Sequence, residues 1–256
     1  MVPFRALDRT AVISDIHGNV PALEAVLTDI ERRGIRTVYC LGDLVGKGPQ
    51  SALAVDICRG VCEGVVRGNW DDVAARPQTP PSPTLQWHRE QLGEARLRYL
   101  EALPNSIDLL MSGKRVRLFH ASPEGVYTRV YLDVPYERQL EMFTNTPFTG
   151  NCLDEPDVVG YGDIHVAGMV SLYRHRKTLF NVGSVGNPLD EPLATYAILE
   201  GVVGGTEKAP FSVQLVRLPY EVEDAIAVAV EMNMPELKPY AKELRTAVYR
   251  MDQGSR

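Results

Sequence analysis

The sequence predicts a protein of the α/β class, and two observations support that class. Up to residue 66, short β-branched runs alternate with segments whose apolar residues recur at helical spacing. Between residues 158 and 218, strand-like segments recur at the spacing of hairpins. The chain has 256 residues, of which 45% are hydrophobic and 23% charged, so it is long and apolar enough to bury a sizeable core.

The first half has the order β-α-β-α-β, which predicts a largely parallel sheet. Asn19 suits the N-cap of the first helix, Pro21 fits the first turn, and Gly34 suits the end. The expected strands are residues 10–14, 37–41 and 61–66, and the expected helices are 20–33 and 51–59.

Two strands in a hairpin and a long helix are expected in the middle of the chain. A proline-rich loop over residues 75–83 comes first. The amphipathic helix over 84–103 follows it, and then come strands at 106–111 and 115–120, which turn at Ser112-Gly113. Residues 122–153 have weak periodicity, with one helix expected at 135–143. We expect this segment to be an excursion that caps a site.

The last part of the chain predicts a mixed second sheet and two terminal helices. The further strands are expected at 158–161, 166–171, 178–181, 195–200 and 211–218, and the helices within 219–251, with a break near Pro235. We expect residues 1–256 to form a single domain.

Composition and charge exclude several classes of protein. The formal net charge of −6 and a pI near 5.5 argue against coating nucleic acid or an anionic membrane. No stretch approaches the ~18 apolar residues that cross a bilayer, and the first ten residues lack the apolar core of a signal peptide. The four cysteines form no CxxC pair, and Cys58 and Cys62 are interpreted as small core residues. A reduced, cytoplasmic protein is therefore expected.

Side chains that bind metals follow several predicted strands directly. The seven candidates are Asp15, His17, Asp43, Asn69, His120, Asp163 and His165. Because sites in open α/β sheets form at the carboxyl ends of strands, we expect them to converge at one edge. Three carboxylates, three imidazoles and one amide suit two divalent cations, which Asp43 could bridge with its two oxygens. Each piece alone is common, since a Gly-Asp after a strand is often only a turn. The remaining histidines, His88 and His175, are interpreted as structural.

This ordered set resembles the calcineurin-like metallophosphoesterase superfamily, whose signature is D-x-H, G-D-x-x, G-N-H-D/E, a single His and G-H-x-H. The matching segments here are 15–17 (DIH), 42–45 (GDLV), 68–71 (GNWD), His120 and 162–165 (GDIH). Segments 14–19 (SDIHGN), 42–49 (GDLVGKGP), 120–123 (HASP) and 181–188 (NVGSVGNP) also resemble the YfcE-like bacterial branch. The resemblance covers roughly residues 10–200 and implies a four-layer α-β-β-α sandwich of two mixed sheets.

The resemblance also implies roles for the candidate residues. Asp15, His17 and His165 would hold the first metal, and Asn69 and His120 the second, with Asp43 bridging. The implied reaction is hydrolysis of a phosphomonoester or phosphodiester by a hydroxide that bridges two divalent cations. Mn²⁺ is expected first, with Fe, Zn²⁺, Ni²⁺ or Mg²⁺ as alternatives. Asp43, Asn69 and His120 would form the catalytic set.

Two positions depart from the family pattern. Asp163 stands where the family has a second-metal His, and a carboxylate can take that role for a hard cation. Trp70 stands in place of the His of G-N-H-D/E, and an indole N–H cannot give up its proton near neutral pH. General-acid help is typically worth ~10²–10⁴-fold in rate. Asp71, Asp72 or a metal-bound water could replace it, or the leaving group departs unaided, as aryl phosphates, phosphodiesters and pyrophosphates do most easily.

Substrate contacts are expected from Asn69, Trp70 and Arg67, although a buried ion pair beneath the sheet edge is the alternative for Arg67. P-loop and Rossmann readings fail, because residues 42–47 (GDLVGK) have the wrong spacing and no G-x-G-x-x-G follows the first strand. The remaining alternative is a catalytically weak or inactive metal- or phosphate-binding scaffold of the same fold. The expected partner is a small phosphoester, and a homodimer could form through a sheet edge or the C-terminal helices.

Overall fold

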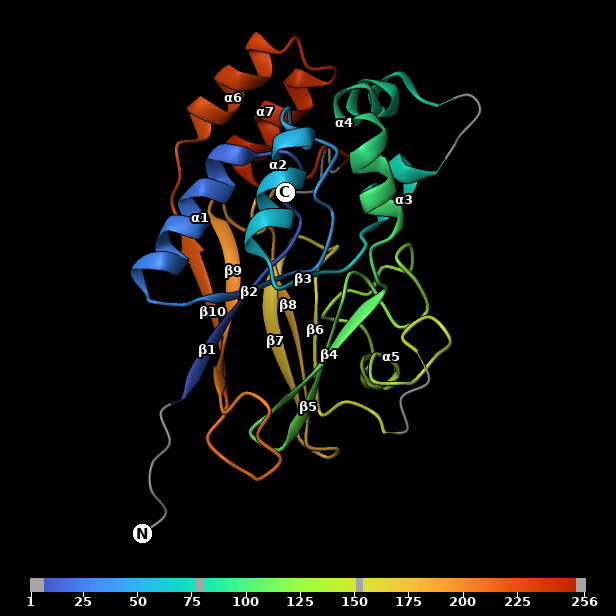
Figure 1. Ribbon diagram of the computed structural model, residues 1–256, viewed down its shortest axis with the longest axis vertical. Helices are drawn as coiled ribbons and strands as arrows, with labels where there is room; N and C mark the ends of the chain where they lie inside the picture. The colour runs from blue at the N-terminus through green and yellow to red at the C-terminus, as the bar shows by residue number, and fades with distance from the viewer. Residues whose placement is uncertain (1–6, 77–80, 151–153, 252–256) are drawn as a thin grey trace.

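Two five-stranded sheets form the centre of the molecule (Figure 1). The computed structural model describes residues 7–76, 81–150 and 154–251. The first sheet has the order β10-β9-β1-β2-β3, and its strands are β1 (Asp8–Ile13), β2 (Thr37–Cys40), β3 (Gly64–Val65), β9 (Ala194–Gly201) and β10 (Ser212–Leu218). β1, β2 and β3 are parallel, as expected, whereas β9 and β10 join antiparallel. The first sheet is therefore mixed, because strands from both halves of the chain build it.

The second sheet has the order β4-β5-β6-β8-β7 and is also mixed. Its strands are β4 (Ser106–Met111), β5 (Lys114–Phe119), β6 (Val158–Tyr161), β7 (Ala167–Leu172) and β8 (Lys177–Val182). Hairpins pair β4 with β5 and β7 with β8, while β6 lies parallel to both β5 and β8. The carboxyl ends of β5 and β6 consequently point in the same direction.

Both faces of the central strands are buried, which makes the fold a sandwich. In β1, Ala11 and Ile13 pack against α1 (Val20–Arg32) and α2 (Ser51–Val61), whereas Val12 packs between the sheets with Leu118 and Phe180. The outer face of the second sheet is covered by the excursion over residues 122–150 and its helix α5 (Tyr136–Glu141). The four-layer architecture is confirmed, and its outermost layer over the second sheet is mostly irregular chain.

The start of α1 and the break between the two C-terminal helices lie where the sequence predicts them. Asn19 caps α1 by accepting a hydrogen bond from the backbone N–H of Ala22. The C-terminal helices α6 (Val222–Glu231) and α7 (Leu237–Thr246) lie on both sides of Pro235 and pack near α1 (Figure 1). No helix in the described parts of the chain has the length and apolar character to cross a membrane.

Three details differ from the expectation. Helix α3 (Asn69–Ala75) was not foreseen; it begins where Asp71 accepts a hydrogen bond from the N–H of Gly68. Helix α4 (Pro83–Glu101) is interrupted at Gly93, where φ is +64° and ψ is +165°, so the long helix is two segments. Strand β3 has two residues instead of six, because α2 continues to Val61 and only Gly64 and Val65 pair with β2.

The cysteines behave as small core residues where the structure describes them. Cys40 and Cys58 are fully buried and Cys62 packs partly buried against the same cluster, each with a free thiol. Cys152 lies outside the described residues.

The loops after β2 and β3 approach each other backbone to backbone. A Cβ at Gly42 would lie 2.4 Å from the backbone N of Gly68, and a Cβ at Gly68 would lie 2.1 Å from Oδ1 of Asp43. Only glycine fits at both positions. This contact brings Asp43 and Asn69, which follow these two glycines directly, into one site.

Replacing Gly42 by Ala is expected to destabilise the fold more than replacing Gly34 by Ala. Both backbones are left-handed, with φ of +90° and +71°, but none of the described atoms lies within 4 Å of a Cβ at Gly34. The left-handed backbone costs roughly 1 kcal/mol in either variant, and overpacking at Gly42 adds about 1–3 kcal/mol. Urea unfolding curves measure the difference, and equal losses of unfolding free energy would show that the loop contact does not constrain the fold.

Candidate metal centre

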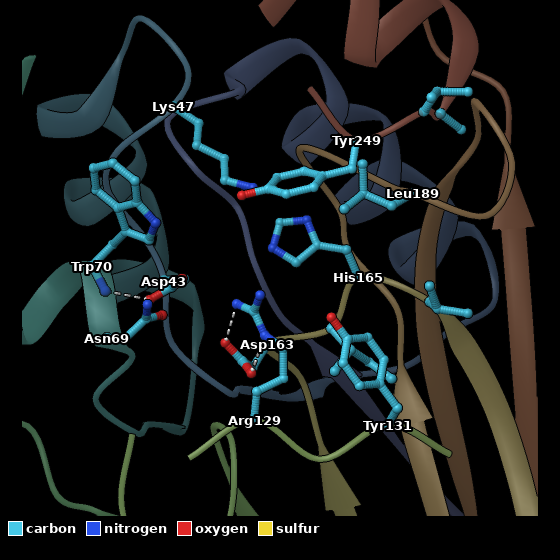
Figure 2. A pocket seen from close by; sticks show the side chains of 14 residues that line it. Asp43, Lys47, Asn69, Trp70, Arg129, Tyr131, Asp163, His165, Leu189 and Tyr249 are labelled. Atoms are coloured by element: carbon cyan, nitrogen blue, oxygen red, sulfur yellow. Dashed lines mark hydrogen bonds and ion pairs between the residues drawn. The ribbon is translucent and has the colours of Figure 1, made fainter. Parts of the chain in front are cut away.

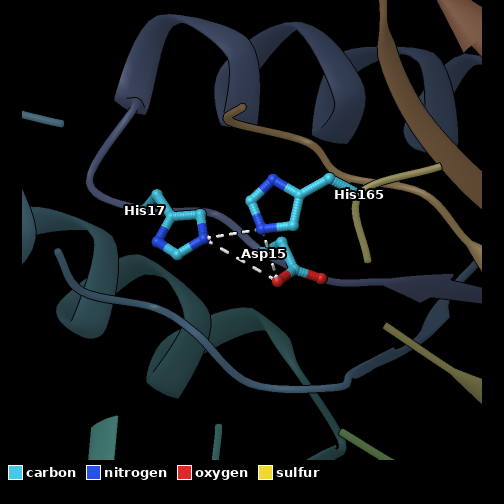
Figure 3. A group of neighbouring side chains, drawn as sticks. All are labelled: Asp15, His17 and His165. Carbon is cyan, nitrogen blue, oxygen red and sulfur yellow. Dashed lines mark hydrogen bonds and ion pairs between the residues drawn. The ribbon is translucent and has the colours of Figure 1, made fainter. Parts of the chain in front are cut away.

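Three buried ligand atoms meet at the carboxyl ends of β1 and β6 (Figure 3). Nε2 of His17 lies 3.1 Å from Nε2 of His165. Oδ1 of Asp15 lies 3.2 Å from Nε2 of His165 and 3.7 Å from Nε2 of His17. Strands from both sheets thus supply one ligand set, as the position of these residues after their strands predicts.

The imidazoles are oriented so that unprotonated nitrogens face one another. Nδ1 of His17 donates to the carbonyl of Val45 at 3.0 Å, and Nδ1 of His165 donates to the carbonyl of Asn187 at 2.5 Å. In the neutral rings Nε2 then has no hydrogen and presents a lone pair. Oδ1 of Asp15, the third atom, has no hydrogen-bond partner among the described residues. Lone pairs this close repel one another, so the three atoms fit a cation placed among them.

The carboxylate of Asp15 is held in its ionised form. Its second oxygen accepts hydrogen bonds from the hydroxyl of Ser14 at 2.6 Å and from the N–H of Asp163 at 3.1 Å.

A second ligand set lies beside the first and consists of Asp43, Asn69 and His120. Nδ1 of His120 donates to the carbonyl of Leu41 at 2.8 Å, and its Nε2 lies 3.0 Å from Oδ1 of Asn69 and 3.5 Å from Oδ1 of Asp43. Oδ2 of Asp43 lies 3.6 Å from Nε2 of His17. Asp43 therefore stands between the two sets, with one oxygen toward each.

The amide of Asn69 directs its oxygen toward Nε2 of His120, 3.0 Å away, as a metal ligand does. With the amide turned over, its NH₂ group would donate to Nε2 of His120 and to both oxygens of Asp43. The same side chain can thus serve a cation with its oxygen or satisfy the bare acceptors with its NH₂ group.

The backbone at the candidate ligands is strained. Five of the seven have left-handed φ values: Asp15 (+54°), His17 (+49°), Asp43 (+52°), Asp163 (+65°) and His165 (+59°). Non-glycine residues rarely adopt this conformation, and strain of this kind clusters at functional sites. In both D-x-H segments, 15–17 and 163–165, the Asp and the His have left-handed backbone, and both side chains point into the site.

Asp163 faces the second set but is also paired with an arginine. Its Oδ1 lies 3.8 Å from Nε2 of His120. Nε and Nη2 of Arg129 donate to Oδ2 and Oδ1 of Asp163, both at 2.9 Å (Figure 2). This hydrogen bonding raises the pKa of Arg129. No motif in the sequence pointed to Arg129, because it lies in the weakly periodic excursion.

A cavity of about 970 Å³ opens onto the two sets (Figure 2). Fourteen side chains line it: Asp43, Lys47, Asn69, Trp70, Arg129, Tyr131, Asp163, Ile164, His165, Val166, Leu189, Ala247, Val248 and Tyr249. The excursion therefore supplies part of the wall, and the segment after α7 supplies another part. The sequence had singled out only some of these residues, and neither Lys47 nor Tyr249 among them.

Arg67 does not line the cavity. Its Nη2 donates to Oδ1 of Asn105 at 2.7 Å, and its Nη1 lies 3.5 Å from Oδ1 of Asp72. Arg67 is not among the side chains that line the cavity, and its guanidinium is held by Asn105 and Asp72, as the ion-pair alternative describes. Trp70, by contrast, lines the cavity as expected, and its ring lies against Gly46.

The two acids considered as replacement proton donors are engaged elsewhere. Asp71 is fully buried and accepts hydrogen bonds from the N–H groups of Leu44 and Gly68, so it ties the two ligand loops together. Asp72 accepts a hydrogen bond from the hydroxyl of Tyr127 at 2.7 Å. Neither acid is among the side chains that line the cavity.

The structural interpretation of the two other histidines agrees with their contacts. His88 is buried in α4, and its Nδ1 lies 3.0 Å from the hydroxyl of Ser51. His175 lies in the turn between β7 and β8, where it bonds the hydroxyl of Tyr136 at 2.8 Å.

The comparisons with known proteins decide the family. Residues 9–202 match the model of the calcineurin-like phosphoesterase superfamily domain. The chain belongs to this superfamily. It is 31% identical over 240 residues to an uncharacterized protein of Methanocaldococcus jannaschii. The alignment covers 88% of this chain and 93% of that protein.

Two crystal structures show the same fold as this phosphoesterase-family chain. A metallophosphoesterase from Sphaerobacter thermophilus is 25% identical, with a TM-score of 0.73. A hypothetical protein from Pyrococcus horikoshii OT3 is 20% identical, also with a TM-score of 0.73. Each alignment covers 94% of this chain and 99% of the other. The superfamily is metal-dependent, and this member brings the candidate metal-binding residues together.

The affinity of this site for a divalent cation is expected to rise with pH up to about 9. Burial alone would lower the pKa of His120, but the carboxylates of Asp43 and Asp15 raise it to about 9. Below that pKa a proton on Nε2 competes with the cation, so affinity falls roughly tenfold for each pH unit. Titration calorimetry with Mn²⁺ in buffers of different ionisation enthalpy measures the released proton. His120→Gln should weaken binding and reduce this proton release, and an unchanged release would contradict the assignment.

Proposed function

We propose that this protein is a metal-dependent phosphoesterase that hydrolyses a phosphomonoester or phosphodiester with two divalent cations. The observation that carries the proposal is the position of Asp43 between two buried ligand sets. Its oxygens lie 3.6 Å from Nε2 of His17 and 3.5 Å from Nε2 of His120. A single carboxylate facing two sets of ligands is suited to bridge two cations.

Each group of residues has a defined task in this proposal. Two bound cations would lower the pKa of a water and offset the charge that builds on the phosphoryl oxygens. Asp15, His17 and His165 hold the first, and Asn69, His120 and Asp163 hold the second. Three carboxylates against four positive charges leave the site positive, so a protein of net charge −6 can still bind a phosphate anion.

Mn²⁺ is the metal we propose first, because the site mixes carboxylate, amide and imidazole ligands. The hydrogen bonds of Arg129 to Asp163 leave each carboxylate oxygen a further lone pair for a cation. A small phosphoester as substrate, a cytoplasmic location and a homodimer remain predictions from the sequence.

The leaving group must depart without a proton from an imidazole at the Asn69-Trp70 loop. Trp70 has an indole there, which lies edge-on to His17 with ring centroids 6.2 Å apart. Asp71 and Asp72 are bonded elsewhere. Substrates with good leaving groups, such as aryl phosphates, activated diesters and phosphoric anhydrides, therefore suit this site best.

The Mn²⁺-loaded protein is expected to hydrolyse p-nitrophenyl phosphate or its bis-ester. Asp43→Ala should lower kcat/KM by roughly 10³-fold or more, because the bridging position supports several kcal/mol of charge stabilisation. Asp224→Ala, a change at an exposed residue of α6, is the matched control. Absorbance of released p-nitrophenolate measures the rate. Bound Mn²⁺ without turnover on a wide phosphoester panel would favour the scaffold alternative.

Asp163→Asn is expected to weaken one cation site and spare the other. The change replaces the carboxylate near His120 with a neutral amide, which is a weaker cation ligand, and leaves the set of Asp15, His17 and His165 complete. The Mn²⁺ content after dialysis, measured by mass spectrometry, should fall from two ions per chain toward one. Asp133→Asn, an exposed position in the same excursion, should keep both. Loss of both cations in Asp163→Asn would argue against separate ligand sets.

A further inference from the structure

Two cationic side chains reach the cavity from opposite sides of His165 in the view of Figure 2. Lys47 comes from the loop between β2 and α2, and Arg129 comes from the excursion after β5. Neither belongs to the seven candidate ligands. Their presence beside a metal site that already attracts anions needs a separate explanation.

Lys47 has no ion-pair partner among the described residues. Its Nζ donates to Oδ1 of Asn187 at 2.8 Å, and no carboxylate oxygen of the described residues lies within 4.0 Å of it. The nearby carboxylate of Glu243 is instead bonded by Nε and Nη2 of Arg250, both at 2.8 Å. An ammonium group has three donors, so two remain for a ligand. Burial lowers the pKa of Lys47 to about 8, which an anion beside it would raise again.

Arg129 is oriented and still has donors to offer. Asp163 uses Nε and Nη2 but not Nη1, and the arginine side chain is 44% exposed. A guanidinium held in this way presents its remaining N–H groups to the cavity at little further entropic cost. The cavity thus has one positive group next to the second ligand set and another on the far side of His165.

The size and walls of the cavity exceed what a lone phosphate needs. A volume of about 970 Å³ lies at the upper end of ordinary ligand pockets. Trp70, Tyr131 and Tyr249 contribute aromatic surface, and Nζ of Lys47 lies 5.8 Å from the ring centre of Tyr249. A ligand with a second anionic group followed by an aromatic group would fill these features.

We propose that Lys47, which lies across His165 from Arg129, forms a subsite for a second phosphate, so that the preferred substrates are phosphoric anhydrides such as nucleoside diphosphates. The inference rests on the proposed phosphoesterase function and narrows its substrate class. The scissile terminal phosphate would lie at the candidate metal ligands, and the next phosphate would lie at Lys47.

The chemistry of an anhydride agrees with the missing imidazole at Trp70. The oxygen of water forms a new bond to the terminal phosphorus, and the bond from that phosphorus to the bridging oxygen breaks. The electron pair stays on the bridging oxygen, which leaves as part of a phosphate, and the proton of water passes to solvent. A departing phosphate needs no proton near neutral pH, since its second pKa is about 6. Lys47 would stabilise the charge on that leaving phosphate.

The test compares ADP with AMP, which differ by one phosphate, in the Mn²⁺-loaded full-length protein. Wild type should have the higher kcat/KM for ADP, and Lys47→Gln should lower the ADP-to-AMP ratio by about tenfold or more, as expected for a hydrogen bond to a charged group. Lys47→Arg should retain most of the ratio. Lys242→Gln, the same chemical change at an exposed residue of α7, should leave the ratio unchanged.

Binding measured without turnover provides the second readout. Calorimetry with the non-hydrolysable α,β-methylene analogue of ADP should show a Kd about tenfold higher in Lys47→Gln, with a smaller change for AMP. Metal content and thermal melting identify any variant that fails to fold, in which case Lys47→Arg and wild type still carry the comparison of ADP with AMP.

The outcomes separate this inference from the proposed function. Hydrolysis of p-nitrophenyl phosphate or AMP without a preference for ADP, or equal losses for ADP and AMP in Lys47→Gln, would overturn the second-phosphate subsite and leave the phosphoesterase intact. Absence of turnover on every phosphoester would overturn the proposed function, and the binding of the methylene analogue would still decide the subsite.

Discussion

The convergence of lone pairs at the sheet edge is the constraint on which the rest of the site depends. Oδ1 of Asp15 and the Nε2 atoms of His17 and His165 lie within 3.7 Å of one another, and all three residues are buried. Such atoms repel, so the surrounding protein must hold them in place. It does so through carbonyls that accept from each Nδ1 and through left-handed backbone at the ligands. A cation is the species that turns this strained arrangement into a favourable one.

The sandwich of two sheets makes that arrangement possible. β1 and β2 bring Asp15, His17 and Asp43 from one sheet, while β5 and β6 bring His120 and His165 from the other. Contact between the loops at Gly42 and Gly68 then sets the distance between Asp43 and the residues after Gly68, and buried Asp71 bonds both loops. The metal site and the core are consequently one structure, because the same loops close the sheets and carry the ligands.

The departures from the family pattern lie on the side of the site that faces the cavity. Trp70 places an aromatic wall where the family pattern has a His, and Asp163 introduces a negative charge that Arg129 neutralises from the excursion. Three candidate ligands behind them, Asp15, His17 and His120, do not line the cavity and follow the pattern. This division fits a site in which the metal chemistry is retained while the leaving-group side is adapted to a particular anion.

The sequence alone determined the alternation of strands and helices, the superfamily and the seven residues that meet at the sheet edge. Those features follow from local periodicity and from motifs whose order the chain preserves. The short helix α3, the break at Gly93 and the antiparallel strands of the first sheet depend on contacts between distant segments, which periodicity does not record. The same reason hid Arg129, Lys47 and Tyr249. Each becomes part of the site only because the excursion, the loop after β2 and the C-terminal segment fold onto one cavity, and sequence spacing carries no information about that meeting.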